Sequence, residues 1–321
     1  MSQEILSKLN TTHIEEISSS RNEPEWLKDY RKNSLSVYDN LPLETSPLYN
    51  KYTDAKKMDP DKVSLSTTTA ETIPSFLQKR LGELENEICI IQIGTNIHKI
   101  NLPDELKSKG LVISSISDAI QNNSELVKKA LEASSSEEDR FTALNNAAFN
   151  SGIFIHIPRN FILEKPIYFL TCLSEDGHST ISRNVIFADE SSKAAIVQEL
   201  YSPKIETQQA YLELMNTNVG DNAQLDVTTL QMLDQSAVTF STKRTDLGQD
   251  AKVNWYSGLF GSMLSRYKIE YFLNGTGASS NDSEVIFGNN EQSFDIQTNV
   301  NHESPATEGR VVEKSILRNK S

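Results

Sequence analysis

The sequence predicts a mainly β protein in which residues 151–321 wind as a right-handed parallel β-helix. Beyond Gly152, short runs of Val, Ile, Phe and Tyr alternate with Gly, Asn, Asp and Ser, and helical periodicity disappears. A turn followed by an alanine recurs here, with alanines at positions 194, 223, 251 and 278, which are 29, 28 and 27 residues apart. Such a period is typical of stacked coils whose strands pair from one coil to the next. A β-sandwich also has short, evenly spaced strands but requires no recurrent turn, so the β-helix is favoured.

Residues 1–70 are expected to form an N-terminal helix and an extended arm. Between residues 22 and 41 the apolar residues recur every three or four positions, which predicts an amphipathic helix. Asn22 is a candidate N-cap and Pro24 would lie in the first turn. Pro42 ends the helix, because the residue before a proline is disfavoured in helical conformation. Residues 44–70 are rich in Thr, Ser, Asp and Lys without any period, so we expect an extended arm there.

Residues 71–150 are expected to form a small α/β subdomain. A helical pattern covers 71–87, and two strands, 88–93 and 97–102, flank a loop of hairpin length. The remaining expected elements are a strand at 111–113, a helix capped by Ser124 that ends at Leu131, and a helix from Asp139 to Phe149 that ends near Gly152.

Composition and charge exclude several classes of protein. The 321 residues are 37% hydrophobic and 23% charged, which is typical of a globular protein. Forty-four acidic residues against thirty-one basic ones give a net charge of −13, which disfavours nucleic acid and anionic membranes as partners. The N-terminus becomes polar too early for a signal peptide. The longest apolar runs are also far shorter than the roughly twenty residues of a membrane span. We therefore expect a soluble, cytoplasmic protein.

The cysteines and histidines show no spacing typical of a metal site. Cys89 and Cys172 are 83 positions apart and both lie in apolar runs, so buried, unreactive thiols are expected. No two of the five histidines stand at ligand spacing. His156 is expected to be a surface or hydrogen-bonded side chain of a strand. His302 precedes Glu303 and is the most interesting of the five, although a structural role is favoured over metal binding there too.

The sequence contains no recognisable catalytic motif. Nothing matches a phosphate-binding loop, and the glycines at 275 and 277 are better explained by a turn than by dinucleotide binding. Neighbouring acids such as Glu137 and Glu138 are expected to be solvated charges. We assign no catalytic, cofactor-binding or metal-ligating residue and expect no enzymatic activity. The alternatives are a carbohydrate-active β-helix enzyme resembling polysaccharide lyases, which needs a lateral cleft with acids and usually calcium, and a self-polymerising filament.

Three separated stretches match motifs in a consistent order. Residues 23–43 have the form E-P-x-W-L…R…L-P-L, and residues 143–158 the form A-L-N…G-x-x-x-x-[VI]-P. Residues 288–307 have the form G-x-x-x-Q-x-x-D…V-x-H-x-x-P-x-T. These stretches resemble the SufB/SufD family of iron–sulfur cluster assembly scaffold proteins, with a likeness that runs from about residue 21 to 321. The chain is short and lacks the cysteine-bearing N-terminal segment of SufB, so it is more similar to the SufD members.

The resemblance implies a scaffold of the SUF complex that pairs with a SufB-like subunit and works with a SufC-like ATPase. It implies no cofactor of the chain's own, because clusters form only at the level of the complex. Homodimers are possible. Family members continue with further coils, a Cys-Ser-His-Gly stretch and a helical region that docks the ATPase. We therefore expect this sequence to be a fragment, and no cluster ligand is transferred to it.

Overall fold

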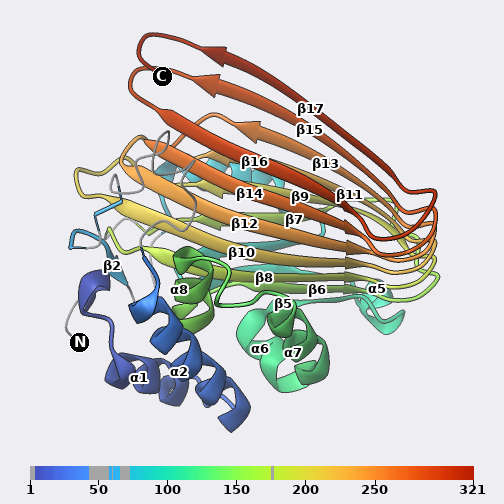
Figure 1. Ribbon diagram of the computed structural model, residues 1–321, viewed down its shortest axis with the longest axis horizontal. Coiled ribbons are helices and arrows are strands. Elements are labelled where there is room, and N and C mark those ends of the chain that lie inside the picture. Colours follow the sequence, from blue (N-terminus) through green and yellow to red (C-terminus); the bar gives the residue numbers. More distant parts are fainter. Residues whose placement is uncertain (1–3, 43–57, 60, 66–72, 175–176) are drawn as a thin grey trace.

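A β-helix of two sheets dominates the computed structural model, which describes residues 4–42, 58–59, 61–65, 73–174 and 177–321 (Figure 1). From residue 153 onward, successive strands alternate between the sheets, and each strand pairs in parallel with the strand two positions later. Twelve strands, two per coil, therefore make six coils. The predicted parallel β-helix is confirmed.

One sheet has seven strands and the other has eight. The seven-stranded sheet contains β5 (Val112–Ser115), β6 (Ile153–Ile157), β8 (Thr180–Ala188), β10 (Gln209–Val219), β12 (Ala237–Leu247), β14 (Leu264–Leu273) and β16 (Ser293–His302). The eight-stranded sheet contains β3 (Cys89–Ile93), β4 (Asn96–Asn101), β7 (Ile167–Cys172), β9 (Lys193–Tyr201), β11 (Gln224–Met232), β13 (Lys252–Leu259), β15 (Ser279–Gly288) and β17 (Glu308–Leu317). A separate antiparallel pair joins β1 (Glu4–Ile5) to β2 (Ser64–Leu65).

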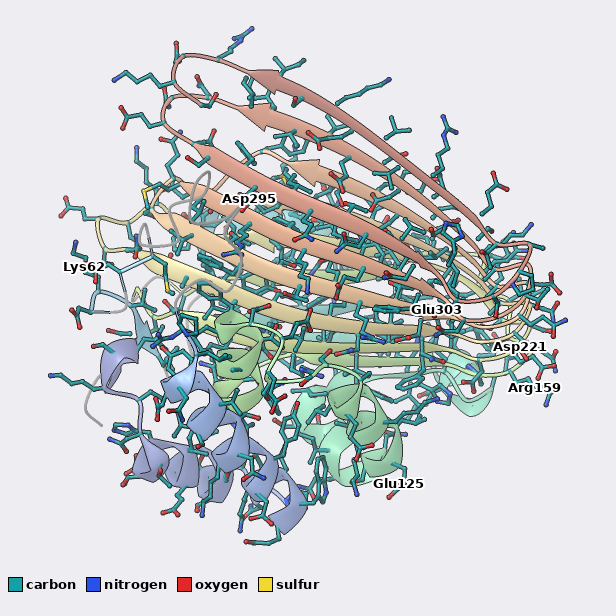
Figure 2. All side chains as sticks on the ribbon, in the orientation of Figure 1. Lys62, Glu125, Arg159, Asp221, Asp295 and Glu303 are labelled. Atoms are coloured by element: carbon teal, nitrogen blue, oxygen red, sulfur yellow. The ribbon has the colours of Figure 1, made fainter. Side chains whose placement is uncertain are left out.

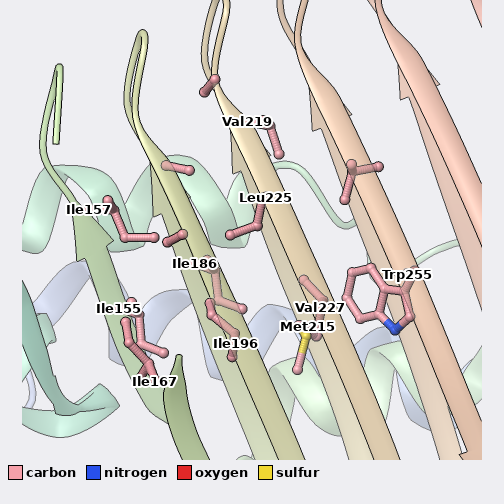
Figure 3. Packing of buried hydrophobic residues seen from close by; sticks show 14 of the residues in the cluster. Ile155, Ile157, Ile167, Ile186, Ile196, Met215, Val219, Leu225, Val227 and Trp255 are labelled. Carbon is pink, nitrogen blue, oxygen red and sulfur yellow. The ribbon is translucent and has the colours of Figure 1, made fainter. Parts of the chain in front are cut away.

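The space between the two sheets is filled by alternate side chains of the strands, apart from the exposed last strand, β17. Strand residues point to opposite faces in turn, so Ile196, Leu225 and Val227 face the interior and belong to one buried cluster (Figure 3). Trp255 is fully buried in the same cluster. Burial of this apolar surface is the main driving force that closes the coils.

The recurrent turn lies where the chain passes from the seven-stranded to the eight-stranded sheet. In each coil it contains one residue in the left-handed backbone conformation. Ala223, Ala251 and Ala278 end successive turns and are fully buried. The strand register places Ser192, not Ala194, as the equivalent residue of the preceding coil, so the inclusion of Ala194 in the repeat was wrong. The residue before each of these positions has positive φ in every coil: Asn160, Ser191, Asn222, Asp250, Gly277 and Ala306. Charged side chains such as Arg159, Asp221 and Glu303 fringe this end of the β-helix (Figure 2).

Helices cover the outer face of the seven-stranded sheet (Figure 1). Their inward residues, among them Leu27 and Leu144, form a second buried cluster with outward-facing sheet residues such as Leu212. The helices of this layer are α1 (Thr11–Ser20), α2 (Glu25–Asn40), α6 (Ile116–Asn122), α7 (Ser124–Glu132) and α8 (Arg140–Ala148). Shorter helical segments are η1 (Leu6–Lys8), η3 (Ser75–Leu77), α4 (Gln78–Glu83) and α5 (Asp104–Ser108).

The structure corrects several expected helix boundaries. Asn22 has φ of 50° and does not cap α2, whose N-cap is Pro24. Ser124 is the first residue of α7, and Asn123 holds the cap position. Asp139 does cap α8, because its side chain accepts hydrogen bonds from two backbone amides. The helix predicted at 71–87 is shorter, and residues 71 and 72 lie outside the described part of the chain.

The strands of residues 71–150 continue the two large sheets. The predicted hairpin is confirmed as β3 and β4, and β3 pairs in parallel with β7, while β5 pairs with β6. Whether residues 70 and 150 are domain boundaries stays a prediction, because these strands belong to the same sheets as the β-helix. Most of the expected arm, 44–70, lies outside the described residues, apart from short stretches that include β2.

Candidate functional site

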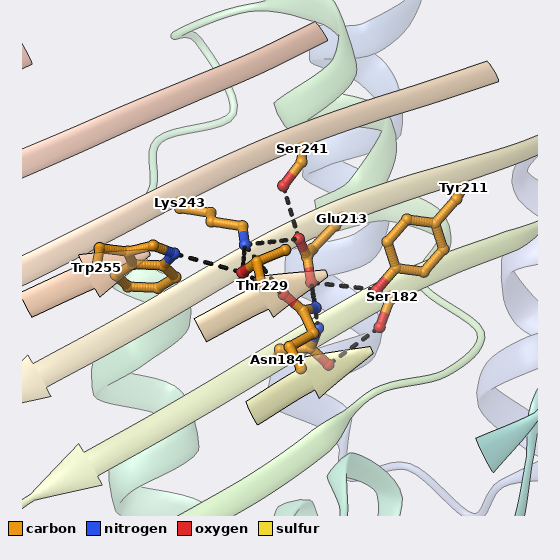
Figure 4. A network of polar contacts seen from close by, with 9 residues as sticks. Ser182, Asn184, Tyr211, Glu213, Thr229, Ser241, Lys243 and Trp255 are labelled. Carbon is orange, nitrogen blue, oxygen red and sulfur yellow. Dashed lines mark hydrogen bonds and ion pairs between the residues drawn. The ribbon is translucent and has the colours of Figure 1, made fainter. Parts of the chain in front are cut away.

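A cluster of buried polar side chains lies inside the β-helix, centred on the carboxylate of Glu213 in β10 (Figure 4). Its Oε1 atom accepts hydrogen bonds from Asn184 Nδ2 at 2.7 Å and Tyr211 OH at 3.1 Å, and also from Gln198 Nε2. Its Oε2 atom accepts a hydrogen bond from Ser241 Oγ at 2.6 Å. Four donors from four strands therefore converge on one buried carboxylate, which compensates for its lost hydration.

Lys243 of β12 supplies the positive charge of this cluster. Its Nζ atom lies 3.9 Å from Glu213 Oε2 and donates to Thr229 Oγ1 at 2.6 Å and to Gln198 Oε1 at 3.0 Å. The same atom lies 4.9 Å from the centre of the Trp255 ring, a favourable cation–π distance. Burial lowers the pKa of Lys243, and the charge of Glu213 opposes that shift. We call these residues, with Asn184, Tyr211 and Ser241, the interior network.

Two further acids extend the polar interior toward the later coils. Asp282 and Glu284 both face inward from β15, where Asp282 accepts a hydrogen bond from Tyr271 OH at 2.8 Å and Glu284 from Thr298 Oγ1 at 2.9 Å. Burial raises the pKa of Asp282 to about 6. Burial, reinforced by the negative charge of Asp282, raises the pKa of Glu284 to about 7.

The register explains why these side chains meet. Gln198, Thr229, Ser257 and Glu284 are aligned partners on successive strands of the eight-stranded sheet. Opposite them, the seven-stranded sheet aligns Ser182, Glu213 and Ser241. A polar row on each sheet therefore runs along the axis of the β-helix, and the two rows face each other.

The chemistry of the interior network is that of a structural cluster. Its charged groups, Glu213 and Lys243, are at most 3% exposed, and their side-chain hydrogen bonds are made to neutral side chains of the same network. Buried polar groups that must all be paired favour one strand register over slipped ones. The network thus fixes how the coils stack.

The candidate residues of the sequence lie apart from this network, and only the two cysteines share a location, in one apolar cluster. Cys89 and Cys172 are both buried, as predicted, and burial raises the pKa of Cys89. His156 Nε2 lies 2.8 Å from Asp189 Oδ2, so its side chain is paired. His302 is exposed at the end of β16, with Nδ1 2.7 Å from Thr307 Oγ1. Among the residues that the structure describes, no three His, Cys, Asp or Glu side chains group closely enough to hold a metal ion.

Two family models match consecutive parts of the chain. The model described as the SufBD protein N-terminal region matches residues 8–169, which is half of the chain. The model described as the SufBD core domain of the SUF system for FeS cluster assembly matches residues 171–321. The chain belongs to the SufBD family.

Relatives in this family align over almost the entire chain. A protein of Staphylococcus aureus (strain USA300), named as an iron–sulfur cluster assembly SufBD family protein, is 27% identical over 322 residues. The alignment covers 95% of this chain and 68% of that protein. A protein of Staphylococcus saprophyticus with the same family name is 25% identical over 321 residues, with the same coverage. The SufB and SufD branches are not distinguished by these matches.

Several residues of the SufBD motifs hold the helical layer and the coils together. Arg31 forms a buried ion pair with Glu23. Asn145 of α8 donates hydrogen bonds to the carbonyl oxygens of Ser182 and Leu212, on two neighbouring coils. At Gly152, which has φ of 141°, an added Cβ would lie 1.9 Å from a backbone carbonyl oxygen, so only glycine fits.

The described surface of this SufBD chain also has a groove of about 330 Å³ between α7 and the seven-stranded sheet. Its charged groups are Lys129 and Asp246, and Asp246 already accepts hydrogen bonds from Arg244 and Asn274. The groove therefore lacks the converging free acids that a carbohydrate-cleaving site needs. Within the described helices, none combines the length and apolar character needed to cross a bilayer.

Sequence reasoning did not find the interior network. Glu213 stands between Leu212 and Leu214. From the sequence alone, such an acid is assigned equally well to the outer, solvent-facing side of a strand or to its inner side. The signal that could have revealed it is the polar residue repeated at the same offset from the turn in successive coils, as with Gln198 and Thr229.

Proposed function

We propose that this SufBD-family chain is a non-enzymatic scaffold subunit of a cytoplasmic SUF complex. In this proposal the chain acts as a SufD-like subunit that pairs with a SufB-like subunit and works with a SufC-like ATPase. The observation that carries the proposal is the consecutive match of the N-terminal and core family models, which together cover the helical layer and the β-helix of one chain. The assembly role given in the names of the staphylococcal relatives supports it.

The distribution of chemical groups in the structure also supports a scaffold. Three charged residues of the β-helix interior have perturbed pKa values, namely Lys243, Asp282 and Glu284, and all three are buried between the sheets and bonded to neighbouring side chains. A catalytic group must instead reach a substrate in a pocket. We propose that the chain has no cofactor of its own and that an iron–sulfur cluster is cargo held by the complex.

Co-purification tests the proposal. The tagged full chain would be co-expressed with the SufB-like and SufC-like subunits of the same source, purified anaerobically, and analysed by size-exclusion chromatography and subunit quantification. We expect a complex containing all three chains. After reconstitution with iron and sulfide, the visible absorption of a cluster should follow the complex and be absent from the isolated chain.

Two controls make the result decisive. The affinity tag alone, co-expressed with the same two subunits, measures background capture, and circular dichroism of the isolated chain verifies that it is folded. A folded chain that captures neither subunit would refute the proposed partnership. Cluster absorption retained by the isolated chain, or depolymerisation of an acidic polysaccharide by it, would refute the proposed scaffold role.

A further inference from the structure

Among the residues that the structure describes, helical segments cover the outer face of the eight-stranded sheet over its first coils and leave it bare over its last coils. The aligned outward residues Ile91 and Leu170 are each 1% exposed, because η3 and α4 pack on them through Leu77. Further along the same row, Val285 of β15 is 49% exposed. One continuous surface thus changes from buried to exposed within one sheet.

The bare part carries large apolar side chains that lie on adjacent coils. Tyr256 of β13 is 42% exposed, although its neighbours Trp255 and Ser257 face the interior. Phe260 is also 42% exposed, and its ring lies over Gly258, where an added Cβ would come within 2.7 Å of it. We define the outer patch as four residues: Tyr256, Phe260, Val285 and Ile316, the last 61% exposed. Contiguous exposed apolar surface of this kind marks an interaction site.

Basic side chains border the outer patch on β17. Lys314 is the aligned neighbour of Val285, Arg310 lies two outward positions before it, and the Arg318 guanidinium lies 5.6 Å from the Phe287 ring centre. Residues 310–320 contain four basic and one acidic residue, in a chain whose net charge is −13. The border of the outer patch is therefore positive where the protein as a whole is negative.

The covered half of the face shows what kind of element fits. There η3 and α4 contribute Leu77 and Leu81 to the apolar contact with the sheet, and Arg80 of α4 donates a hydrogen bond to Glu199 Oε2 at 2.9 Å. Glu199 belongs to the same outward row as Val285. On the covered half the sheet provides the acid and the helix the cation, whereas on the bare half the sheet provides the cations.

We propose that the outer patch docks an acidic amphipathic helix of a partner protein, laid across β11 to β17, on the same face on which α4 packs over the first coils. The helix would place apolar residues on Tyr256 and Val285 and carboxylates against Lys314 and Arg318. Three strand spacings amount to about 14 Å, which roughly three helical turns can span. This inference goes beyond the proposed SUF role, because it rests only on the packing and charge of this face.

Two other occupants are less compatible with the charges. An anionic bilayer would be attracted by the border of the outer patch but repelled by the net charge of the molecule. A second copy of the chain, apposed patch to patch, would bring Lys314 and Arg318 close to their equivalents. Both remain outcomes of the test.

The binding test uses the full chain and synthetic peptides of about 18 residues, followed by fluorescence anisotropy. One peptide is amphipathic with leucines on one face and glutamates beside them, the second carries lysine in place of each glutamate, and the third is a scrambled form of the first. We expect the acidic amphipathic peptide to bind at least about tenfold more tightly than the other two, with affinity falling as salt is added.

Substitutions locate the binding. Val285→Asp should weaken binding of the acidic peptide about tenfold or more, and the double change Lys314→Glu, Arg318→Glu should move the preference to the lysine peptide. The matched control is Ile162→Asp, which introduces the same charge at a residue that is 68% exposed and bridges to Lys193 of β9 in the first coil, away from β13 to β17, and it should change nothing. Tyr256→Ser serves as a second variant if thermal melting shows that Val285→Asp is misfolded.

Several results would overturn the inference. Equal binding of the acidic and basic peptides would show that charge does not select the partner. Equal peptide affinities of the Val285→Asp and Ile162→Asp proteins would show that the peptide does not bind at the outer patch. Flotation with phosphatidylserine vesicles that is lost in Val285→Asp assigns the face to membranes. Sedimentation that shows a concentration-dependent dimer, abolished by Val285→Asp, assigns it to a second copy.

Discussion

Arg31 of α2 and Glu23 form a bidentate ion pair that is buried beneath the helical layer. The guanidinium Nε and Nη2 atoms donate to the two carboxylate oxygens at 2.8 and 2.7 Å, and Nη1 donates to the carbonyl oxygen of Ala147 in α8. The guanidinium carbon lies 3.7 Å from the centre of the Phe149 ring. Burial alone would raise the pKa of Glu23, but the charge and hydrogen bonds of Arg31 outweigh it and the pKa is lowered. The pair thus ties the start of the chain to the helix that enters the β-helix.

Replacing Arg31 with Met should destabilise the protein strongly, because the buried carboxylate of Glu23 would lose its hydrogen-bonded partner and keep only the weaker attraction of Arg21. We expect the free energy of unfolding to fall by about 3–5 kcal/mol, measured by urea denaturation. The double variant Arg31→Met, Glu23→Gln should lose less than the sum of the single changes. As a control, Glu15→Gln removes an exposed pair with Lys32 and should leave the midpoint unchanged. Equal effects of the buried and exposed changes would contradict this account.

Lys243→Met should be destabilising for a related reason inside the β-helix. The change leaves Glu213 charged, and it removes a donor from Thr229 and Gln198. We expect a loss of about 2–4 kcal/mol in the free energy of unfolding. Combining it with Glu213→Gln should recover part of that loss, since the buried charge is then gone. A double variant that is less stable than the sum of the two single changes would argue against the pairing.

Gly275 should tolerate no side chain, because the coils stack closely at the turn. An added Cβ would lie 2.1 Å from the backbone nitrogen of Gln249 in the preceding coil. Gly275→Ala should therefore lower the melting temperature, with a loss of about 1–3 kcal/mol. The matched control is Gly82→Ala in α4, where nothing lies within 4 Å and alanine should stabilise the helix slightly. Similar melting temperatures for the two variants would show that the coils can move apart.

The sequence allowed the β-helix, the hairpin of β3 and β4 and the helix α8 to be predicted because their signals are local. Turn residues, strand alternation and the cap at Asp139 all act within a few positions along the chain. The helix α1 was missed although Asn10 caps it and Ile14 and Ile17 are buried one turn apart. Its buried residues are few, so its periodicity is weak over the window in which a helix is normally recognised.

The interior network could not be predicted, since it depends on contacts between residues that are distant in sequence. Glu213 and Lys243 are thirty positions apart and meet only when β10 and β12 pair in the observed register. The mistaken inclusion of Ala194 in the repeat has the same cause. The number of residues per coil varies, so a spacing of 29 residues between Ala194 and Ala223 looked regular although Ser192 is the equivalent residue. Register is set by the packing of whole coils, and a single alanine does not define it.

Asp282 and Glu284 should make the stability of the protein depend on pH in an unusual direction. Their pKa values are raised to about 6 and about 7, whereas unfolded carboxyl groups titrate near 4. Between these values the folded protein binds more protons than the unfolded chain, so the free energy of unfolding falls as pH rises. The contribution of these two groups is fully present below about pH 4 and is lost above about pH 7. We expect a decrease of about 1–3 kcal/mol across this window, seen in urea unfolding at pH 5 and pH 8.

The double variant Asp282→Asn, Glu284→Gln separates the effect of these two carboxyl groups from that of acids such as Glu23. The lowered pKa of Glu23 makes the free energy of unfolding rise, not fall, with pH, and does so at lower pH. Because the amides stay neutral, the difference between the two pH values should shrink, and the double variant should be more stable than the natural chain at pH 8. Glu291→Gln removes a charge from an exposed side chain and should leave the difference as it is. An unchanged pH dependence in the double variant would mean that both carboxyl groups reach water through the last coils, where Glu313 is exposed beside Glu284.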